Sequence, residues 1–313
     1  MSQSQSQSQS QRSAQERRTP RPGERVGPWL LEAVLGEGGL GQIYRARGAD
    51  GAVVALKVLR PEADQVDPAT RARFQNEGQV LLGLRHPNLI AVLDRGRDDE
   101  RGVGWLAMEL VAGQDLDQLL ARVPRLSPGL ALHVIDGCAQ ALAAAHAQGI
   151  LHRDVKASNV LLTGAGEVKL ADFGLALAAG QSRITGRDEL PGTLPYTAPE
   201  VLFDARWSPA SDAYALGVLA HRLLAGAYPF PQREPMRLIE AHLTALPPDL
   251  CELVPGLPEP VGALVAALLA KEPERRPTCA QLPARLRATG CLMERSQVAA
   301  AIGALLEEAQ RDA

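Results

Sequence analysis

A short strand-turn-strand pattern in the middle of the chain constrains the fold most. Residues 160–162 are apolar, residues 168–171 are apolar except for Lys169, and the five residues between the two runs include two glycines. Apolar runs of this length on either side of a glycine-containing turn predict a tight β-hairpin. Apolar strands would hold the polar residues on either side of them in fixed positions.

Four polar side chains flank this hairpin. Asp154, Lys156 and Asn159 precede it, and Asp172 follows it. Their spacing allows all four to face one cleft, where they would supply one base, one cation and two metal ligands. Phosphoryl transfer needs an aligned hydroxyl, neutralised charge and Mg²⁺ held by oxygen ligands. The pattern therefore indicates a phosphotransferase.

The same segment resembles the catalytic and metal-binding loops of protein kinases. His-Arg-Asp at 152–154 and Asp-Phe-Gly at 172–174 occur in the family's order and spacing. The resemblance implies an α+β, bilobal protein-kinase fold, with a small antiparallel β-sheet N-lobe carrying one main helix and a larger, mostly helical C-lobe. The short Gly-Gly-Leu-Gly, the Ala-rich composition and Ala157 in place of proline are similar to bacterial Hanks-type (eukaryotic-like) serine/threonine kinases.

A glycine-rich segment at residues 36–41 has the pattern Gly-x-Gly-x-x-Gly. A dinucleotide-binding turn has this pattern too, but a helix follows it. Here strands at 42–47 and 53–59 are predicted, so we expect a β-hairpin whose tip folds over phosphates. The resemblance assigns ATP binding in this region to Leu35, Gly36, Glu37, Gly38, Gly39, Leu40, Gly41, Ile43 and Ala55.

Lys57 stands in the middle of an apolar strand. A buried, unpaired lysine costs several kcal/mol, so it either points to water from an edge strand or has a partner. The resemblance implies that Lys57 holds the α- and β-phosphates of ATP. Its partner would be Glu77, the only acid in a helix predicted at residues 69–84.

The segment Met108-Glu109-Leu110-Val111 resembles the hinge between kinase lobes. By this resemblance Met108 borders the back pocket, and backbone groups of Glu109 and Val111 pair with adenine. Asp115 has two interpretations, a contact to the ribose or the N-cap of a helix predicted at 116–121. Leu161 completes the expected ATP-binding residues.

A phosphorylated activation segment is also implied. Arg153 beside the base would need an anion, and a phosphate on Thr185, or less favourably Ser182, would supply it. Lys156 together with Thr193 resembles the serine/threonine-specific branch of the family. Ser158 stands where kinases that prefer arginine before the target carry an acid, so no basic substrate motif is expected.

Three more residues are expected to have structural roles. Glu200, in Ala-Pro-Glu, should pair with Arg276. Asp212 opens a very apolar helix and is either a brace beneath the catalytic loop, as in kinases, or only a helix N-terminal charge. Further strands are predicted at residues 89–93 and 105–110, and a long helix at 128–146.

The resemblance also defines cofactors and partners. Asp154, Lys156 and Asn159 would be catalytic, and Asn159 and Asp172 would hold Mg²⁺ or Mn²⁺ with ATP. Protein substrates are expected, together with a transient homodimer for trans-autophosphorylation. A net charge of −3 gives no indication of nucleic-acid or membrane-surface binding. Four scattered cysteines and no apolar run long enough for a bilayer predict a cytoplasmic protein.

The domain organisation follows from these assignments. Residues 1–25, rich in Ser, Gln, Arg and Pro, are expected to form a solvated tail, with partner docking as the alternative. Residues 26–290 form the kinase domain, with the N-lobe at about 26–108 and the C-lobe at about 112–290. Residues 291–313 predict an amphipathic helix, favoured to cover the C-lobe, with a dimer or partner-docking helix as the alternative.

Two other functions compete with an active protein kinase. A pseudokinase would bind nucleotide or a partner without transfer, but such proteins commonly lose one of the catalytic residues that this chain retains. A small-molecule phosphotransferase of related fold would share the acid pair, but would not be expected to carry Gly192-Thr193, Ala-Pro-Glu200 and Arg276.

Overall fold

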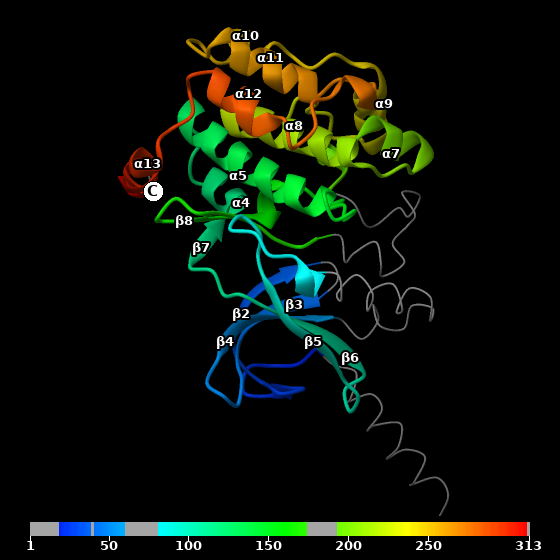
Figure 1. Cartoon of the computed structure of the whole chain (residues 1–313), viewed down its shortest axis with the longest axis vertical. Coiled ribbons are helices and arrows are strands. Elements are labelled where there is room, and N and C mark those ends of the chain that lie inside the picture. Colours follow the sequence, from blue (N-terminus) through cyan, green and yellow to red (C-terminus); the bar gives the residue numbers. More distant parts are fainter. Residues whose placement is uncertain (1–18, 39–40, 60–80, 174–192, 312–313) are drawn as a thin grey trace, which may run out of the picture. The chain divides into compact units, whose positions relative to one another are not determined.

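The chain divides into two compact units, shown in Figure 1 as a computed structural model. One unit comprises Met1–Arg85, Ile90–Val111 and Leu175–Ser182, and the other His86–Leu89, Ala112–Gly174 and Arg183–Ala313. The structure describes residues 19–38, 41–59, 81–173 and 193–311. Most of the helix predicted at 69–84 lies outside these described residues.

The first unit is built on a six-stranded antiparallel sheet with the order β1-β2-β3-β4-β6-β5. Its strands are β1 (Arg25–Val26), β2 (Trp29–Gly38), β3 (Gly41–Arg47), β4 (Val53–Leu59), β5 (Val92–Asp98) and β6 (Val103–Met108). Alternate residues of β4 are buried, which places Val54, Leu56 and Val58 on the core face. Trp29 and Trp105 meet edge to face in this core, with ring centroids 6.3 Å apart.

The glycine-rich segment joins two strands, as predicted. Gly38 of β2 pairs with Gly41 of β3, and the pairing continues along both strands. A strand therefore follows the glycines, and the helix of a dinucleotide-binding turn is absent from the described residues 41–47. A Cβ on Gly41 would lie 2.1 Å from the carbonyl oxygen of Val58, so only glycine fits there.

The strand predicted at residues 89–93 is wrong in position. β5 begins at Val92 and continues through a charged run to Asp98, and Leu89 instead forms an isolated parallel bridge with Leu170 in the second unit. Charged side chains are tolerated because β5 is an edge strand. Gly96 allows the Trp105 ring to approach β5, since a Cβ there would lie 2.3 Å from the ring.

The second unit is mostly helical. Its helices are α4 (Leu116–Leu120), α5 (Pro128–His146), α7 (Pro199–Asp204), α8 (Pro209–Ala225), α9 (Pro235–Thr244), α10 (Leu250–Leu253), α11 (Glu259–Leu268), α12 (Leu282–Ala288) and α13 (Arg295–Arg311). Short 3₁₀ turns are η1 (Ala157–Asn159), η2 (Leu194–Tyr196) and η3 (Pro273–Arg275). A small antiparallel sheet has the order β7-β8-β9, with β7 (Gly113–Asp115), β8 (Val160–Thr163) and β9 (Val168–Leu170).

Helices α5 and α8 form the centre of this unit and lie side by side (Figure 1). The helix predicted at 128–146 is confirmed as α5, whose apolar face is buried. The N-cap of α8 is Ser208, which forms a capping box with Ser211, and the C-cap is Gly226 in the left-handed conformation. Gly217 lets α11 approach closely, because a Cβ at this position would lie 2.7 Å from Leu268 Cβ.

The C-terminal helix α13 packs on the second unit. Val298 and Ile302 are buried, and α13 contacts α5 beside the β8–β9 hairpin (Figure 1). The favoured interpretation of this helix, packing against the C-terminal lobe, therefore agrees with the structure. All four cysteines are free thiols. Over the described ranges, each helix is too short or too polar to cross a bilayer.

Candidate active site

The β8–β9 hairpin holds the two ends of the polar segment together. The Thr163 N–H donates to Glu167 O, and the Gly166 N–H donates to Thr163 O, which closes the turn. At the other end of the hairpin, the Ala171 N–H donates to Asn159 O at 2.8 Å. The residue before Asp172 is thus tied to Asn159, so the hairpin brings the two predicted metal ligands close together in the fold.

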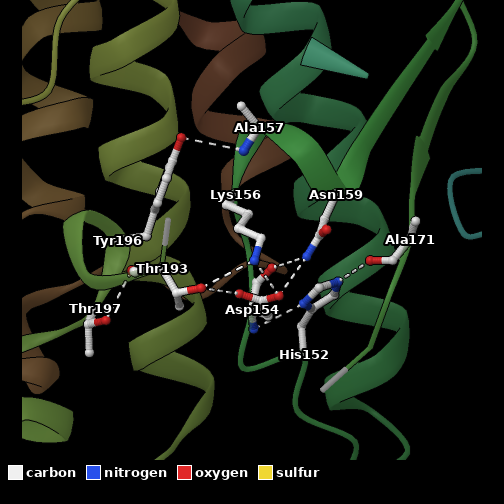
Figure 2. Close-up of polar contacts among 9 residues, drawn as sticks. All are labelled: His152, Asp154, Lys156, Ala157, Asn159, Ala171, Thr193, Tyr196 and Thr197. Carbon is white, nitrogen blue, oxygen red and sulfur yellow. Dashed lines mark hydrogen bonds and ion pairs between the residues drawn. The ribbon is translucent and has the colours of Figure 1, made fainter. Parts of the chain in front are cut away.

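Asp154 is the centre of a polar cluster (Figure 2). Lys156 Nζ lies 2.8 Å from Asp154 Oδ2, and Asn159 Nδ2 donates to the same oxygen at 2.9 Å. Thr193 Oγ1 donates to Asp154 Oδ1 at 3.2 Å and accepts from Lys156 Nζ at 3.2 Å. Three side chains therefore fix the carboxylate, which remains 20% exposed and open to a proton donor.

His152 supports the loop from the interior. It is fully buried, and its Nδ1 accepts from the Asp154 N–H, so Nε2 carries the proton and donates to Ala171 O at 2.9 Å. Burial lowers the pKa of His152 below its usual range and keeps the ring neutral. Its ring also lies against Phe173, with centroids 4.5 Å apart. His152 thus links the loop before β8 with the segment after β9.

Asp212 braces the catalytic loop from α8. Its two oxygens accept the backbone N–H groups of His152 at 2.9 Å and Arg153 at 2.8 Å. Arg153 has a φ of +65°, a conformation that is strained for a residue other than glycine. The buried Asp212 carboxylate compensates this strain. His146, at the end of α5, is a further partner that the sequence did not reveal, with Nε2 2.8 Å from Asp212 Oδ2.

Glu200 and Arg276 form the ion pair that the sequence predicted. Arg276 donates from Nη1 to Oε1 at 2.7 Å and from Nη2 to Oε2 at 2.8 Å. The Arg276 side chain is completely buried and the Glu200 side chain 9% exposed. Arg276 also donates to the carbonyls of Ala210, Ala270 and Lys271 and lies over the Tyr214 ring.

The first unit carries several of the expected nucleotide-binding residues on its sheet. Ala55 and Lys57 alternate with the buried residues of β4 and lie on the opposite face. β4 lies between β3 and β6, so the edge-strand interpretation of Lys57 is wrong. Lys57 pairs with Ile43 on one side, and Ala55 pairs with Met108 on the other. Leu35 is 48% exposed near the end of β2.

The hinge residues follow β6. The Glu109 N–H donates to Ala91 O at 2.9 Å, so pairing with a base would fall to its carbonyl. Asp115 Oδ1 accepts the Gln118 N–H at 2.8 Å as the N-cap of α4, which is the capping interpretation of this residue. Leu161 pairs with Asp115 in the small sheet.

Several predicted site residues lie outside the described residues. They are Gly39, Leu40, Glu77, Ser182 and Thr185. Their predicted roles remain predictions.

The donor groups at the hairpin suit a magnesium ion held together with a nucleotide. Asn159 Nδ2 donates to both the backbone and side-chain oxygens of Asp154, so its remaining polar atom is an oxygen. Asp172 adds a carboxylate at φ +56°, the strained conformation common at functional sites. Two oxygen ligands suit Mg²⁺ when phosphates and water complete the shell. In the part of the chain that the structure describes, no cluster of three or more His, Cys, Asp or Glu forms a separate metal cage.

Comparisons with known proteins agree with this geometry. Residues 29–285 match the protein kinase domain family. Serine/threonine-protein kinase PknJ of Mycobacterium tuberculosis is 40% identical over 259 residues, covering 80% of this chain and 43% of PknJ. PknA of the same species is 37% identical over 263 residues, covering 82% of this chain and 60% of PknA. The chain therefore matches about half the length of these relatives.

Solved structures give the same result. The crystal structure of the Mycobacterium tuberculosis PknI kinase domain is 32% identical, with a TM-score of 0.69. The match covers 87% of this chain and all of the PknI domain.

Proposed function

Because the chain belongs to the protein kinase domain family, we propose that it is an ATP-dependent protein serine/threonine kinase in bacterial signalling. It transfers the γ-phosphoryl group of ATP to serine and threonine hydroxyls of proteins. The observation that carries this proposal is the Asp154 carboxylate, which Lys156, Asn159 and Thr193 hold in one orientation. Free thiols and the use of ATP suit a cytoplasmic location.

Asp154 acts as the base. Its carboxylate accepts a hydrogen bond from the substrate hydroxyl, aligns the oxygen for attack and takes the proton late in transfer. Lys156 places its ammonium beside the reacting oxygens, where negative charge redistributes. Thr193 holds both groups, because its hydroxyl contacts Asp154 and Lys156 together.

The remaining roles concern the cofactor. Asn159 and Asp172 would hold Mg²⁺, which neutralises phosphate charge when bound with ATP. Lys57, paired with Glu77, would bind the α- and β-phosphates. Thr185, or else Ser182, would be autophosphorylated within a transient homodimer and pair with Arg153.

A labelling assay tests this function. The full chain is incubated with radiolabelled Mg-ATP and myelin basic protein, beside Asp154→Asn and a control, Asp99→Asn, whose carboxylate is 90% exposed. Label in the wild type and control, with at least about 1000-fold less in Asp154→Asn, is the expected result. Phosphoamino-acid analysis should give phosphoserine and phosphothreonine.

The labelling assay, together with a measurement of nucleotide binding, separates the competing functions. Nucleotide binding without label in any protein would indicate a pseudokinase and overturn the proposal. Label in a small molecule but none in protein, in a parallel assay of low-molecular-weight acceptors, would indicate a small-molecule phosphotransferase.

A further inference from the structure

Arg222 of α8 occupies a polar site beneath the catalytic loop. Its Nη1 lies 2.6 Å from Asp117 Oδ1 in α4 and donates to the Tyr196 hydroxyl at 2.8 Å. The guanidinium carbon is 4.8 Å from the centroid of the Tyr228 ring. With its side chain only 19% exposed, Arg222 is fixed from three sides. A cation held so tightly is suited to orienting a neighbour.

The neighbour that it orients is Tyr196. The Tyr196 hydroxyl oxygen also accepts the backbone N–H of Ala157 at 3.4 Å, as Figure 2 shows. Tyr196 is 3% exposed and Ala157 is fully buried, so water cannot readily replace this bond. The Tyr196 ring is also held edge to face against Tyr228, with centroids 5.5 Å apart.

The position of the Ala157 peptide affects the residues on both sides of it in the catalytic loop. It lies between Lys156 and Asn159, and the side chains of both contact Asp154. A shift of the Ala157 peptide would therefore displace two of the three groups that orient the carboxylate. Catalytic groups displaced by about 1 Å can lose about 100-fold in rate.

We propose that Arg222 is a positioning residue for phosphoryl transfer, acting on the catalytic loop through the Tyr196 hydroxyl and the Ala157 N–H. Asp117 fixes the guanidinium, the guanidinium fixes the hydroxyl, and the hydroxyl fixes the loop. The expected effect on turnover rests on the proposed kinase function. The expected effect on the order of the catalytic loop does not rest on that function, so turnover and loop order are measured separately.

The kinetic test uses four single variants of the full chain and the Tyr196→Phe/Arg222→Met double variant. Tyr196→Phe keeps the ring and removes the hydroxyl, Arg222→Met keeps the aliphatic bulk and removes the donor, and Arg222→Lys retains the charge. Arg237→Met is the matched control, because Arg237 is 75% exposed in a surface ion pair. Initial rates with Mg-ATP and myelin basic protein give kcat and both KM values, and thermal melting confirms folding.

Tyr196→Phe and Arg222→Met should each lower kcat about tenfold with little change in either KM. The Tyr196→Phe/Arg222→Met double variant should be no slower than the slower single variant, because both substitutions act through the hydrogen bond between the Tyr196 hydroxyl and the Ala157 N–H. Arg222→Lys should recover most of the loss, and Arg237→Met should match the wild type. Losses that multiply to about 100-fold, or a higher KM for the protein substrate at unchanged kcat, would overturn the proposal, the latter by showing direct substrate contact.

Hydrogen exchange tests the loop independently of activity. Peptides covering residues 152–160 should exchange at least about fivefold faster in Tyr196→Phe and Arg222→Met than in Arg237→Met. If Arg222→Met fails to fold, Asp117→Asn releases the guanidinium from its anchor without altering the buried hydroxyl and should give a smaller increase. Equal exchange in all variants would refute the positioning role, even if the wild type proved inactive and the kinase proposal had failed.

Discussion

His146 Nε2 lies 2.8 Å from Asp212 Oδ2, and through this contact the end of α5 and the catalytic loop share one buried carboxylate. The same carboxylate accepts the backbone N–H groups of His152 and Arg153. Three donors from α5 and the catalytic loop therefore converge on two oxygens. Asp212 thus connects the helical core of the second unit to the residues beside Asp154.

Replacing Asp212 by Asn should disorganise this connection. An amide has one oxygen, so its NH₂ group would face a backbone N–H and leave at least one buried donor unpaired. We expect the free energy of unfolding to fall by about 1–3 kcal/mol and kcat to fall at least about tenfold. Urea unfolding and initial rates measure the two effects. Wild-type values for both would show that the brace is dispensable.

The Glu200–Arg276 pair should be costly to break. Arg276→Met leaves the Glu200 carboxylate, 9% exposed, without its bidentate partner, which typically costs about 3–5 kcal/mol. The adjacent Arg275 is a matched control, because its side chain is 75% exposed and its Nε lies 3.8 Å from Glu272 Oε2 in a surface ion pair. Arg275→Met should change the free energy of unfolding by less than about 1 kcal/mol. If urea unfolding gave the same loss of free energy for Arg276→Met and Arg275→Met, the burial of the Glu200–Arg276 pair would not explain its cost.

Thr193 should matter through its hydroxyl and not its shape. Thr193→Val keeps the volume but removes the group that donates to Asp154 and accepts from Lys156. We expect kcat to fall about 10- to 100-fold in the valine variant, whereas Thr193→Ser should remain within about threefold of the wild type. A valine variant as active as the serine variant would show that the hydroxyl has no role in turnover.

Acid should destabilise the second unit through His242. Burial, with the nearby charge of Lys271, lowers the pKa of His242 to about 3 in the folded chain, against about 6.5 when unfolded. Its Nδ1 also lies 2.8 Å from the Tyr214 hydroxyl, which donates to the neutral ring. Between these pKa values the unfolded chain binds the extra proton. Stability therefore falls as the pH falls from 6.5 towards 3, by up to about 1.4 kcal/mol per pH unit.

His242→Gln checks this dependence, because glutamine does not titrate but can still accept from Tyr214. The slope of unfolding free energy against pH, measured by urea unfolding between pH 7 and pH 4, should be smaller in the variant. Parallel curves for the wild type and variant would exclude His242 as the source.

Elements with strong local periodicity were predicted well from the sequence. α5 begins at Pro128 and ends at His146 as expected, and β4 has the predicted bounds Val53–Leu59. The polar cluster around Asp154 was also foreseen, because its members other than Thr193 are within a few residues of one another. In each case the information lies in neighbouring residues, where apolar spacing and turn chemistry determine the local structure.

Other features depend on residues far apart in the chain. His146 and Asp212 are 66 positions apart, and Arg222 reaches Tyr196 across 26 positions. Neither pairing has a local signal, since a histidine at a helix end and an arginine in an apolar helix occur in many surroundings. β5 was misplaced for a similar reason. The charged run in β5 has the composition of a turn. It is compatible with a strand only because β5 lies at the edge of the sheet, which the sequence does not reveal.

The two glycines in the turn between β8 and β9 differ in backbone conformation and in the space around them. Gly166 has a φ of +83°, and a Cβ there would lie 2.7 Å from Val298 Cγ1 of α13. Gly164 has no such φ, and a Cβ there would meet nothing within 4 Å. Gly166→Ala should therefore lower the free energy of unfolding by about 1–3 kcal/mol, while Gly164→Ala should change it by less than about 1 kcal/mol.

Pairing each glycine variant with Val298→Ala separates the two causes of this loss. Val298→Ala removes the close contact, so it should recover the part of the Gly166→Ala loss that comes from the clash with α13 and leave the part that comes from backbone strain. Urea unfolding of the single and double variants measures both parts. Equal stability of Gly166→Ala and Gly164→Ala would contradict both the close packing of α13 on this turn and the strain of the positive φ, because these two features distinguish the positions.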